Sequence, residues 1–235
     1  MPSRVVLEIC VESTDRAIAA ERGGAHRIEL CSDLSCGGIT PNAGLIEATR
    51  KQLRIPIHVL IRPRAGDFCY SKPEFEIMAH DIRAAKDLRV DGIVLGILNE
   101  AEQVDISRTR RLVELARPLP VTFHRAFDLC RDKDRNVCLE AVIQTGAARI
   151  LTSAGKDRVV DGITRIAILV RAAGDRIAIM PGGGVNAGNI QQILQQTGAP
   201  EIHASLGSAD ATNNTSAHEF EGRVRRVRDI VEAMR

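Results

Sequence analysis

The sequence predicts a (β/α)8 TIM barrel, an α/β fold that spans residues 1–235 as a single domain. Short apolar segments of strand character alternate eight times with longer amphipathic segments of helical character. Each repeat takes about 25 to 30 residues, and a glycine or a short polar loop separates its elements, as in a barrel of this size. An open doubly wound sheet is the alternative, but it usually has about six units, and no Gly-x-Gly-x-x-Gly follows the first strand.

The elements follow from alternation, capping signals and breakers. Strands are expected at residues 6–10, 26–31, 57–62, 91–95, 121–124, 149–152, 176–180 and 201–204. Helices are expected at residues 17–21 (after a capping signal at 13–15), 41–53, 73–88, 106–116, 135–144, 159–173, 186–196 and 218–234. Thr40 before Pro41 predicts the N-cap of the second helix, and Asn186 predicts the N-cap of the seventh.

Composition excludes several classes of protein. The formal charge is +2, the arginines are scattered apart from residues 223–228, and there is no tryptophan and one tyrosine, so no nucleic-acid partner is expected. No stretch approaches the about 20 apolar residues of a membrane span. Six cysteines without a secretory pattern predict free thiols in a reducing cytoplasm, and none is spaced as Cys-x-x-Cys, so structural zinc is not expected.

Two neighbouring strands repeat the pattern Glu-x-Cys, as Glu8 with Cys10 and Glu29 with Cys31. Side chains two residues apart share one face of a strand, so matching register would bring two carboxylates and two thiols to one barrel mouth. Soft thiolates select Cu(I), and adjacent strands lie about 4.8 Å apart, which makes Cys10 and Cys31 candidate metal ligands. The alternative is a pair of small hydrophobic side chains that pack the barrel.

Charged side chains stand near the ends of other predicted strands. A carboxylate inside a barrel needs a partner, and we expect Glu8 and Glu29 to pair with residues from strands three and five. The expected partners are Arg62, Arg64, His124 and Arg125. One interpretation is a structural ion-pair network. The other is a TIM-barrel enzyme for a small anionic or phosphorylated substrate, with Glu8, Glu29, Arg62 and His124 as catalytic residues.

The exits of the last strands are rich in small residues. Gly182, Gly183 and Gly184 follow the seventh strand and Ser205 follows the eighth, where many barrels bind phosphate through backbone N–H groups. Tight turning explains a triple glycine equally well. Ser153, in the loop after the sixth strand, and His203, on the eighth strand, are further candidate ligand residues, although a histidine there is more often a core residue with satisfied hydrogen bonds.

The ordered motifs resemble those of the CutC copper-homeostasis family over essentially the whole chain. The matching segments are residues 7–10, 27–31, 37–41, 61–68, 122–128, 149–153, 181–186 and 201–205. The resemblance implies a cytoplasmic TIM barrel, often a homo-oligomer (a dimer or a tetramer), linked to copper handling. It also aligns Cys10 and Cys31 with the copper-binding cysteines proposed for that family. The expected function is therefore Cu(I) binding at the C-terminal mouth of the barrel, with a copper ion or a small anionic ligand as the partner.

Overall fold

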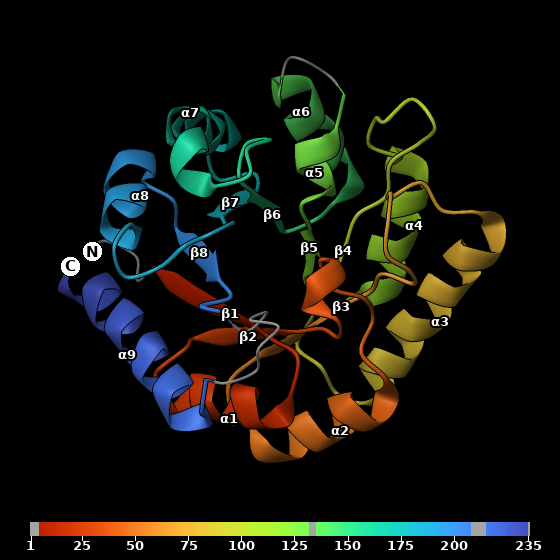
Figure 1. The fold of residues 1–235 in the computed structure, drawn as a ribbon. Helices are drawn as coiled ribbons and strands as arrows, with labels where there is room; N and C mark the ends of the chain where they lie inside the picture. The colour runs from red at the N-terminus through yellow and green to blue at the C-terminus, as the bar shows by residue number, and fades with distance from the viewer. Residues whose placement is uncertain (1–4, 132–134, 208–214, 235) are drawn as a thin grey trace.

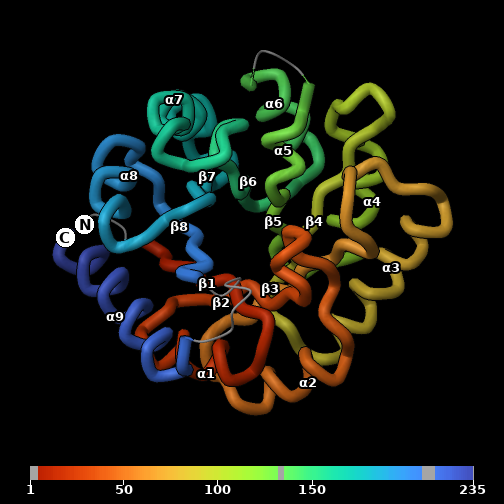
Figure 2. The backbone as a smooth tube through the Cα atoms, viewed as in Figure 1, coloured from red at the N-terminus to blue at the C-terminus, as the bar shows by residue number. Residues whose placement is uncertain are grey.

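Eight parallel strands form a ring that helices surround (Figure 1). The structure is a computed structural model, and it describes residues 5–131, 135–207 and 215–234. The strands are β1 (Val6–Val11), β2 (Arg27–Leu30), β3 (Ile57–Leu60), β4 (Gly92–Leu95), β5 (Val121–Phe123), β6 (Arg149–Thr152), β7 (Ala178–Pro181) and β8 (Glu201–Ala204). The hydrogen-bonded ladder runs from β7 through β6, β5, β4, β3, β2 and β1 to β8, and β8 lies against β7, which nearly closes the ring (Figure 2). The predicted TIM barrel is confirmed.

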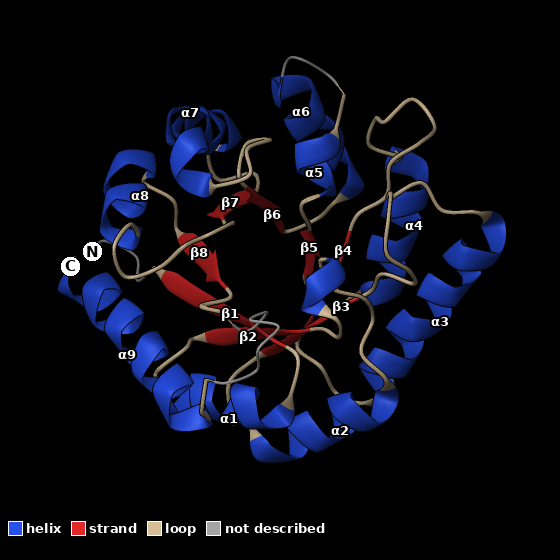
Figure 3. Cartoon of the chain, in the orientation of Figure 1, coloured by secondary structure: helices blue, strands red, loops and turns tan. Residues whose placement is uncertain are grey.

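Helices connect the strands on the outside of the ring (Figure 3). They are α1 (Thr14–Arg22), α2 (Ala43–Gln52), α3 (Lys72–Asp87), α4 (Ile106–Ala116), α5 (Ala126–Leu129), α6 (Arg135–Thr145), α7 (Ile163–Ala173), α8 (Ile190–Thr197) and α9 (Ala217–Ala233). The described residues also form two short 3₁₀ helices, η1 (Leu34–Cys36) and η2 (Val159–Gly162). η1 lies in the loop between β2 and α2, at the C-terminal end of the ring, where strand–helix loops of this fold gather.

Two predicted helix starts are wrong, because Thr40 and Asn186 form hydrogen bonds within loops instead of capping a helix. Asn42 caps α2, while the Thr40 hydroxyl accepts a hydrogen bond from the Arg62 backbone N–H at 2.9 Å. Asn186 precedes α8 by several residues, and its side-chain oxygen accepts from the Gly188 N–H at 2.8 Å in a local turn. Thr40 therefore joins the loops after β2 and β3, which both border the barrel mouth.

The apolar core lies between the strands and the helices. On β1, Leu7, Ile9 and Val11 are fully buried in that core, and the alternate residues Glu8 and Cys10 turn toward the barrel interior. Branched apolar side chains usually fill the interior of such a barrel. Here the interior carries charge, which has to be compensated inside the protein.

The register between β1 and β2 differs from the matching register that would align the two Glu-x-Cys patterns. Glu8 lies opposite Arg27, and Cys10 lies opposite Glu29. The second pattern is therefore displaced by two residues toward the mouth, because strands in a barrel are tilted and staggered. Each carboxylate and thiol of β1 consequently lies one layer deeper than its counterpart on β2.

Gly92 on β4 leaves room for the ring of His58 across the strand pair. A Cβ at residue 92 would lie 2.4 Å from that ring, which is itself buried and has little space to move. We expect Gly92→Ala to lower the free energy of unfolding by about 1 to 3 kcal/mol, measured by urea denaturation. The control Gly222→Ala, with nothing within 4 Å in α9, should instead raise it by up to about 1 kcal/mol. An unchanged stability of Gly92→Ala would contradict this packing.

Candidate metal centre

Two thiols meet where β1 and β2 reach the barrel mouth. The Sγ atoms of Cys10 and Cys31 are 3.6 Å apart, both side chains are buried, and neither cysteine forms a disulfide with another described residue. Leu60, Val94 and the half-buried Leu34 of η1 pack around them. The thiols therefore occupy a small apolar cluster inside the ring, separate from the core outside it.

The Cys10 thiol holds its proton firmly. The hydrogen bond with Cys31 and burial raise the pKa of Cys10 well above its usual value, and the nearby Glu29 carboxylate adds to the shift. The Cys10 Sγ lies 4.0 Å from Glu29 Oε1. A metal ion that binds here must displace a proton, as thiolate ligation requires.

A cavity of about 280 Å³ opens above the thiols at the C-terminal end of the ring. The predicted site residues that line it are Cys10, Glu29, Arg62, His124, Arg125, Gly183, Gly184, His203 and Ser205. Five others lie outside its lining, namely Glu8, Cys31, Arg64, Ser153 and Gly182. The structure thus brings together most of the side chains that the strand ends predicted, but it does not bring Glu8 to the surface of the cavity.

Glu8 lies beneath the cavity in a buried ionic network. Arg27 donates to Glu8 through Nε and to Glu201 through one terminal nitrogen, and the two ion pairs are almost fully buried. Arg149 Nε is 3.1 Å from Glu201 and extends the network. His203 Nδ1 lies 2.7 Å from the second carboxylate oxygen of Glu8. Two carboxylates and two guanidinium groups therefore alternate along the barrel interior.

The expectation that Arg62, Arg64, His124 or Arg125 pairs with the two glutamates is wrong. The stagger between β1 and β2 places Arg27 beside Glu8, and β8 supplies His203 from the other side. Sequence reasoning missed four members of this network: Arg27 and His58, which contact Glu8, and Glu201 and Arg149, which continue the network from Arg27. Period-two alternation was the available signal, since Arg27 precedes Glu29, and Glu201 precedes His203, by two residues on the same strand.

The two glutamates differ in protonation. Burial alone would raise the pKa of Glu8, but Arg27 and the hydrogen bond from His203 outweigh it and hold that pKa well below its usual range. Burial raises the pKa of Glu29 to about 7, against the opposing charge of His203. Burial would lower the pKa of His203, yet its contacts with Glu8 and Glu29 raise it. Glu8 is therefore an anion, whereas Glu29 takes up a proton near neutral pH.

Arg62 fastens loops at the mouth. Its terminal nitrogens donate to the backbone oxygens of Cys36 and Gly38 at 3.1 and 2.7 Å, and to that of Gly66 at 2.8 Å. These bonds hold the η1 segment against the loop after β3. Arg64 pairs with Asp67 of the latter loop and with Glu74 in the first turn of α3, and it does not line the cavity. Neither guanidinium group therefore has two unengaged N–H donors with which to bind an oxyanion, as the sequence had suggested.

The exits of β5 and β6 are joined by Asp128, which sequence reasoning also missed. Arg125 donates to Asp128 at 2.8 Å and to the Ser153 hydroxyl at 2.8 Å. The Asp128 carboxylate accepts further hydrogen bonds from Thr152 and from the Ser153 backbone N–H. Ser153 is fully buried by these contacts, so it acts in loop structure rather than in the cavity wall.

His124 stays neutral in the cavity wall. Burial lowers its pKa to about 3, and the nearby Arg62 charge acts in the same direction. Its Nδ1 accepts a hydrogen bond from the Ala126 N–H at 3.1 Å, so the proton of the neutral ring is assigned to Nε2. That Nε2 is buried and has no hydrogen-bond partner among the described residues.

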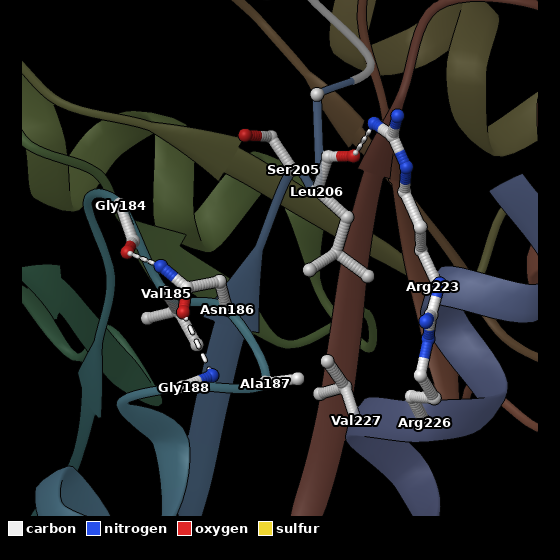
Figure 4. Close-up of a pocket in the computed structure, with 11 residues that line it drawn as sticks. Gly184, Val185, Asn186, Ala187, Gly188, Ser205, Leu206, Arg223, Arg226 and Val227 are labelled. Atoms are coloured by element: carbon white, nitrogen blue, oxygen red, sulfur yellow. Dashed lines mark hydrogen bonds between the residues drawn. The ribbon is translucent and has the colours of Figure 1, made fainter. Parts of the chain in front are cut away.

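A second, larger cavity of about 500 Å³ lies beside the glycine-rich exits of β7 and β8, against α9 (Figure 4). Gly184 and Ser205 line it together with Arg223 and Arg226. Gly182 does not, and a Cβ there would lie 2.5 Å from Leu151. Close packing therefore accounts for this glycine, and neither thiol reaches the second cavity.

The CutC family model matches residues 5–208 of the chain. The chain belongs to the CutC family. A protein of Xylella fastidiosa named as a family protein CutC is 45% identical over 214 residues, which cover 91% of this chain and 79% of the relative. The Homo sapiens protein named "Copper homeostasis protein cutC homolog" is 46% identical over 203 residues, with 86% and 74% of the two chains covered.

Solved structures agree with this CutC assignment. The crystal structure of the putative copper homeostasis protein CutC from Streptococcus agalactiae has a TM-score of 0.81 at 35% identity, and covers 86% of this chain and 98% of its own. Phosphoribosylanthranilate isomerase from Thermotoga maritima has a TM-score of 0.61 at 11% identity, with 97% and 99% covered, and shares the barrel fold alone. Within the described part of the chain, no helix is long and apolar enough to cross a membrane.

The Arg27 ion pairs supply a test of the internal network. We expect Arg27→Met to lower the free energy of unfolding by about 3 to 5 kcal/mol, because Glu8 and Glu201 would lose a buried charged partner. Urea denaturation measures this. The control Arg176→Met removes an ion pair with Glu140 on the surface and should change the value by less than about 1 kcal/mol. Similar losses in both variants would contradict the buried network.

His124 should make stability depend on pH. Its pKa of about 3 in the fold lies below that of an unfolded histidine, near about 6.5, so between these values only the unfolded state binds the proton. The free energy of unfolding should therefore fall as pH decreases through this window, by up to about 1.4 kcal/mol per unit from this residue. In His124→Asn the slope should be shallower by that amount, and in the exposed control His218→Asn it should be unchanged. Identical slopes in wild type and His124→Asn would contradict a neutral buried ring.

Proposed function

We propose that the protein binds Cu(I) through Cys10 and Cys31 at the barrel mouth, in the service of copper homeostasis. The observation that carries this proposal is the pair of buried thiols 3.6 Å apart beside a cavity, neither of them in a disulfide with a described residue. Thiolates are the protein ligands that Cu(I) prefers. The copper-homeostasis names of the human and Streptococcus relatives support the same ion as the partner.

The spacing of the sulfurs suits two-coordinate binding after a small adjustment. With metal–sulfur bonds of about 2.3 Å, a linear S–Cu–S unit spans about 4.6 Å, so the sulfurs would separate by about 1 Å. Rotation of the Cys10 side chain toward the cavity that it lines would supply this movement. The ion would replace thiol protons, and its positive charge would offset part of the thiolate charge in this apolar cluster.

The strand register favours a metal over a disulfide. Cys10 lies opposite Glu29, so Cys31 lies two residues further along the neighbouring strand. From the strand spacing and the rise per residue, the two Cα atoms are about 8 Å apart, beyond the about 7 Å that a relaxed disulfide permits. The pair is thereby suited to stay reduced. We infer a reducing compartment, the cytoplasm, where Cu(I) and free thiols are both stable.

An enzyme acting on a small anionic or phosphorylated substrate is not favoured. Glu8 is closed off beneath the cavity by Arg27 and His203, and the terminal nitrogens of Arg62 are engaged by loop carbonyls. Of the four residues considered catalytic, Glu29, Arg62 and His124 each keep one unpartnered polar atom among the described residues. On Arg62 that atom is Nε alone, because both terminal nitrogens bind loop carbonyls, so the guanidinium has no free pair of donors for an anion.

The test is a titration of reduced protein with Cu(I) in the presence of a competing Cu(I) chelator, without oxygen. We expect wild type to take one ion per chain with an affinity that falls by about 100-fold or more in Cys10→Ser/Cys31→Ser. The control Cys69→Ser changes a half-buried cysteine outside the thiol cluster and should bind as wild type does. Equal affinities of the double variant and wild type would reject the site, provided that circular dichroism shows both to be folded.

A further inference from the structure

A second set of metal-ligating side chains lies beside the thiols. Glu8, Glu29 and His203 each offer one ligand atom, and these three atoms all lie within 4.8 Å of one another. We propose that Glu8, Glu29 and His203 form a binding site for a divalent first-row cation of the Zn²⁺ type, separate from the two thiols. The inference goes beyond Cu(I) binding and does not depend on it.

The distances suit such an ion. His203 Nδ1 lies 2.7 Å from Glu8 Oε1 and 3.7 Å from Glu29 Oε2. Tetrahedral zinc with bonds of about 2.0 to 2.1 Å places its ligand atoms about 3.4 Å apart, between these two values. Imidazole and carboxylate are both ordinary zinc ligands. The two carboxylate atoms lie within 4.8 Å of one another, so an adjustment of His203 together with an approach of the carboxylates by up to about 1.4 Å would complete the triangle.

The independent sign of a ligand is an unsatisfied carboxylate oxygen. Glu29 is 6% exposed, and its Oε2 is buried without a hydrogen-bond partner among the described residues, in the wall of the mouth cavity. A buried carboxylate oxygen left unpaired is costly. A cation at the floor of the cavity would coordinate it directly, whereas His203 Nδ1, 3.7 Å away, is beyond hydrogen-bond distance.

The surroundings support a metal on these atoms. Arg27 donates to Glu8 Oε2 and leaves Oε1 for His203 or for an ion, so it orients the carboxylate from behind. Glu29 and His203 line the cavity, which gives an ion a path from the mouth. Three protein ligands with a cavity on the fourth side match the open arrangement of zinc sites that also bind a small molecule or water.

The charged groups of the barrel interior leave a bridging position between Glu8 and Glu29 that a cation can occupy. Glu8 is an anion compensated by Arg27, while Glu201 is shared between Arg27 and Arg149. In the structure, the Nδ1 atom of His203 contacts both Glu8 and Glu29. A divalent cation would take over that bridging position, and His203 would become a ligand rather than a hydrogen-bond donor.

The experiment measures Zn²⁺ binding to tag-free, reduced protein by competition with a chromophoric zinc chelator. The variants are Glu29→Gln, which keeps the shape and removes the charge, His203→Gln, and Cys10→Ser/Cys31→Ser. We expect one Zn²⁺ per wild-type chain, an affinity lower by about 10-fold or more in Glu29→Gln and His203→Gln, and retained binding in the cysteine variant. Glu140→Gln is the matched control, a glutamate on the outer surface, and should bind as wild type does.

X-ray absorption at the zinc edge identifies the ligands without reference to any activity. The proposal expects a shell of nitrogen and oxygen near about 2.0 Å and no sulfur near about 2.3 Å. Sulfur in the shell, loss of zinc in the cysteine variant with retention in Glu29→Gln, or no stoichiometric binding by wild type would each overturn it. Cu(I) titration of Glu29→Gln separates the two sites, because unchanged Cu(I) affinity with lost zinc is the result expected of independent ligand sets.

Discussion

The charge of Glu8 inside the barrel is the constraint on which the rest of the interior depends. A fully buried carboxylate is tolerated because Arg27 compensates it, and Arg27 in turn is held by Glu201. Arg149 completes the alternation of signs. Most barrels of this fold fill the same positions with branched apolar residues, so stability here relies on paired charges at the centre and on apolar packing outside the ring.

Above this buried ion-pair network, thiol donors and carboxylate and imidazole donors lie side by side at the barrel mouth. The thiols of Cys10 and Cys31 lie in an apolar cluster, and Glu29 stands between them and His203. Soft and hard donors within a few ångströms of one another are suited to different metal ions. The loops above them are fastened by Arg62, whose hydrogen bonds to Cys36, Gly38 and Gly66 hold η1 over the thiol cluster.

Much of the fold could be predicted because alternation and capping are local properties of the chain. The eight strand–helix repeats, and the positions of most strands to within a few residues, follow from apolar periodicity and from glycine at the exits. The approach of Cys10 to Cys31 also followed, because two neighbouring parallel strands end at one edge, although the strands are shifted by two residues from the matching register expected. The predicted helix caps at Thr40 and Asn186 are wrong because a side-chain oxygen accepts a backbone N–H equally well at a helix N-terminus and in a loop.

By itself the sequence determined a TIM barrel with two Glu-x-Cys strands and a polar mouth, since each of these is a matter of local pattern. Only the tertiary structure decided which charges meet. The stagger between β1 and β2 put Arg27, rather than Arg62 or His124, beside Glu8, and β8 brought His203 to Glu8 from 195 residues away in the chain. Register and closure of a barrel depend on all eight strands together, so no segment of the sequence read alone contains them.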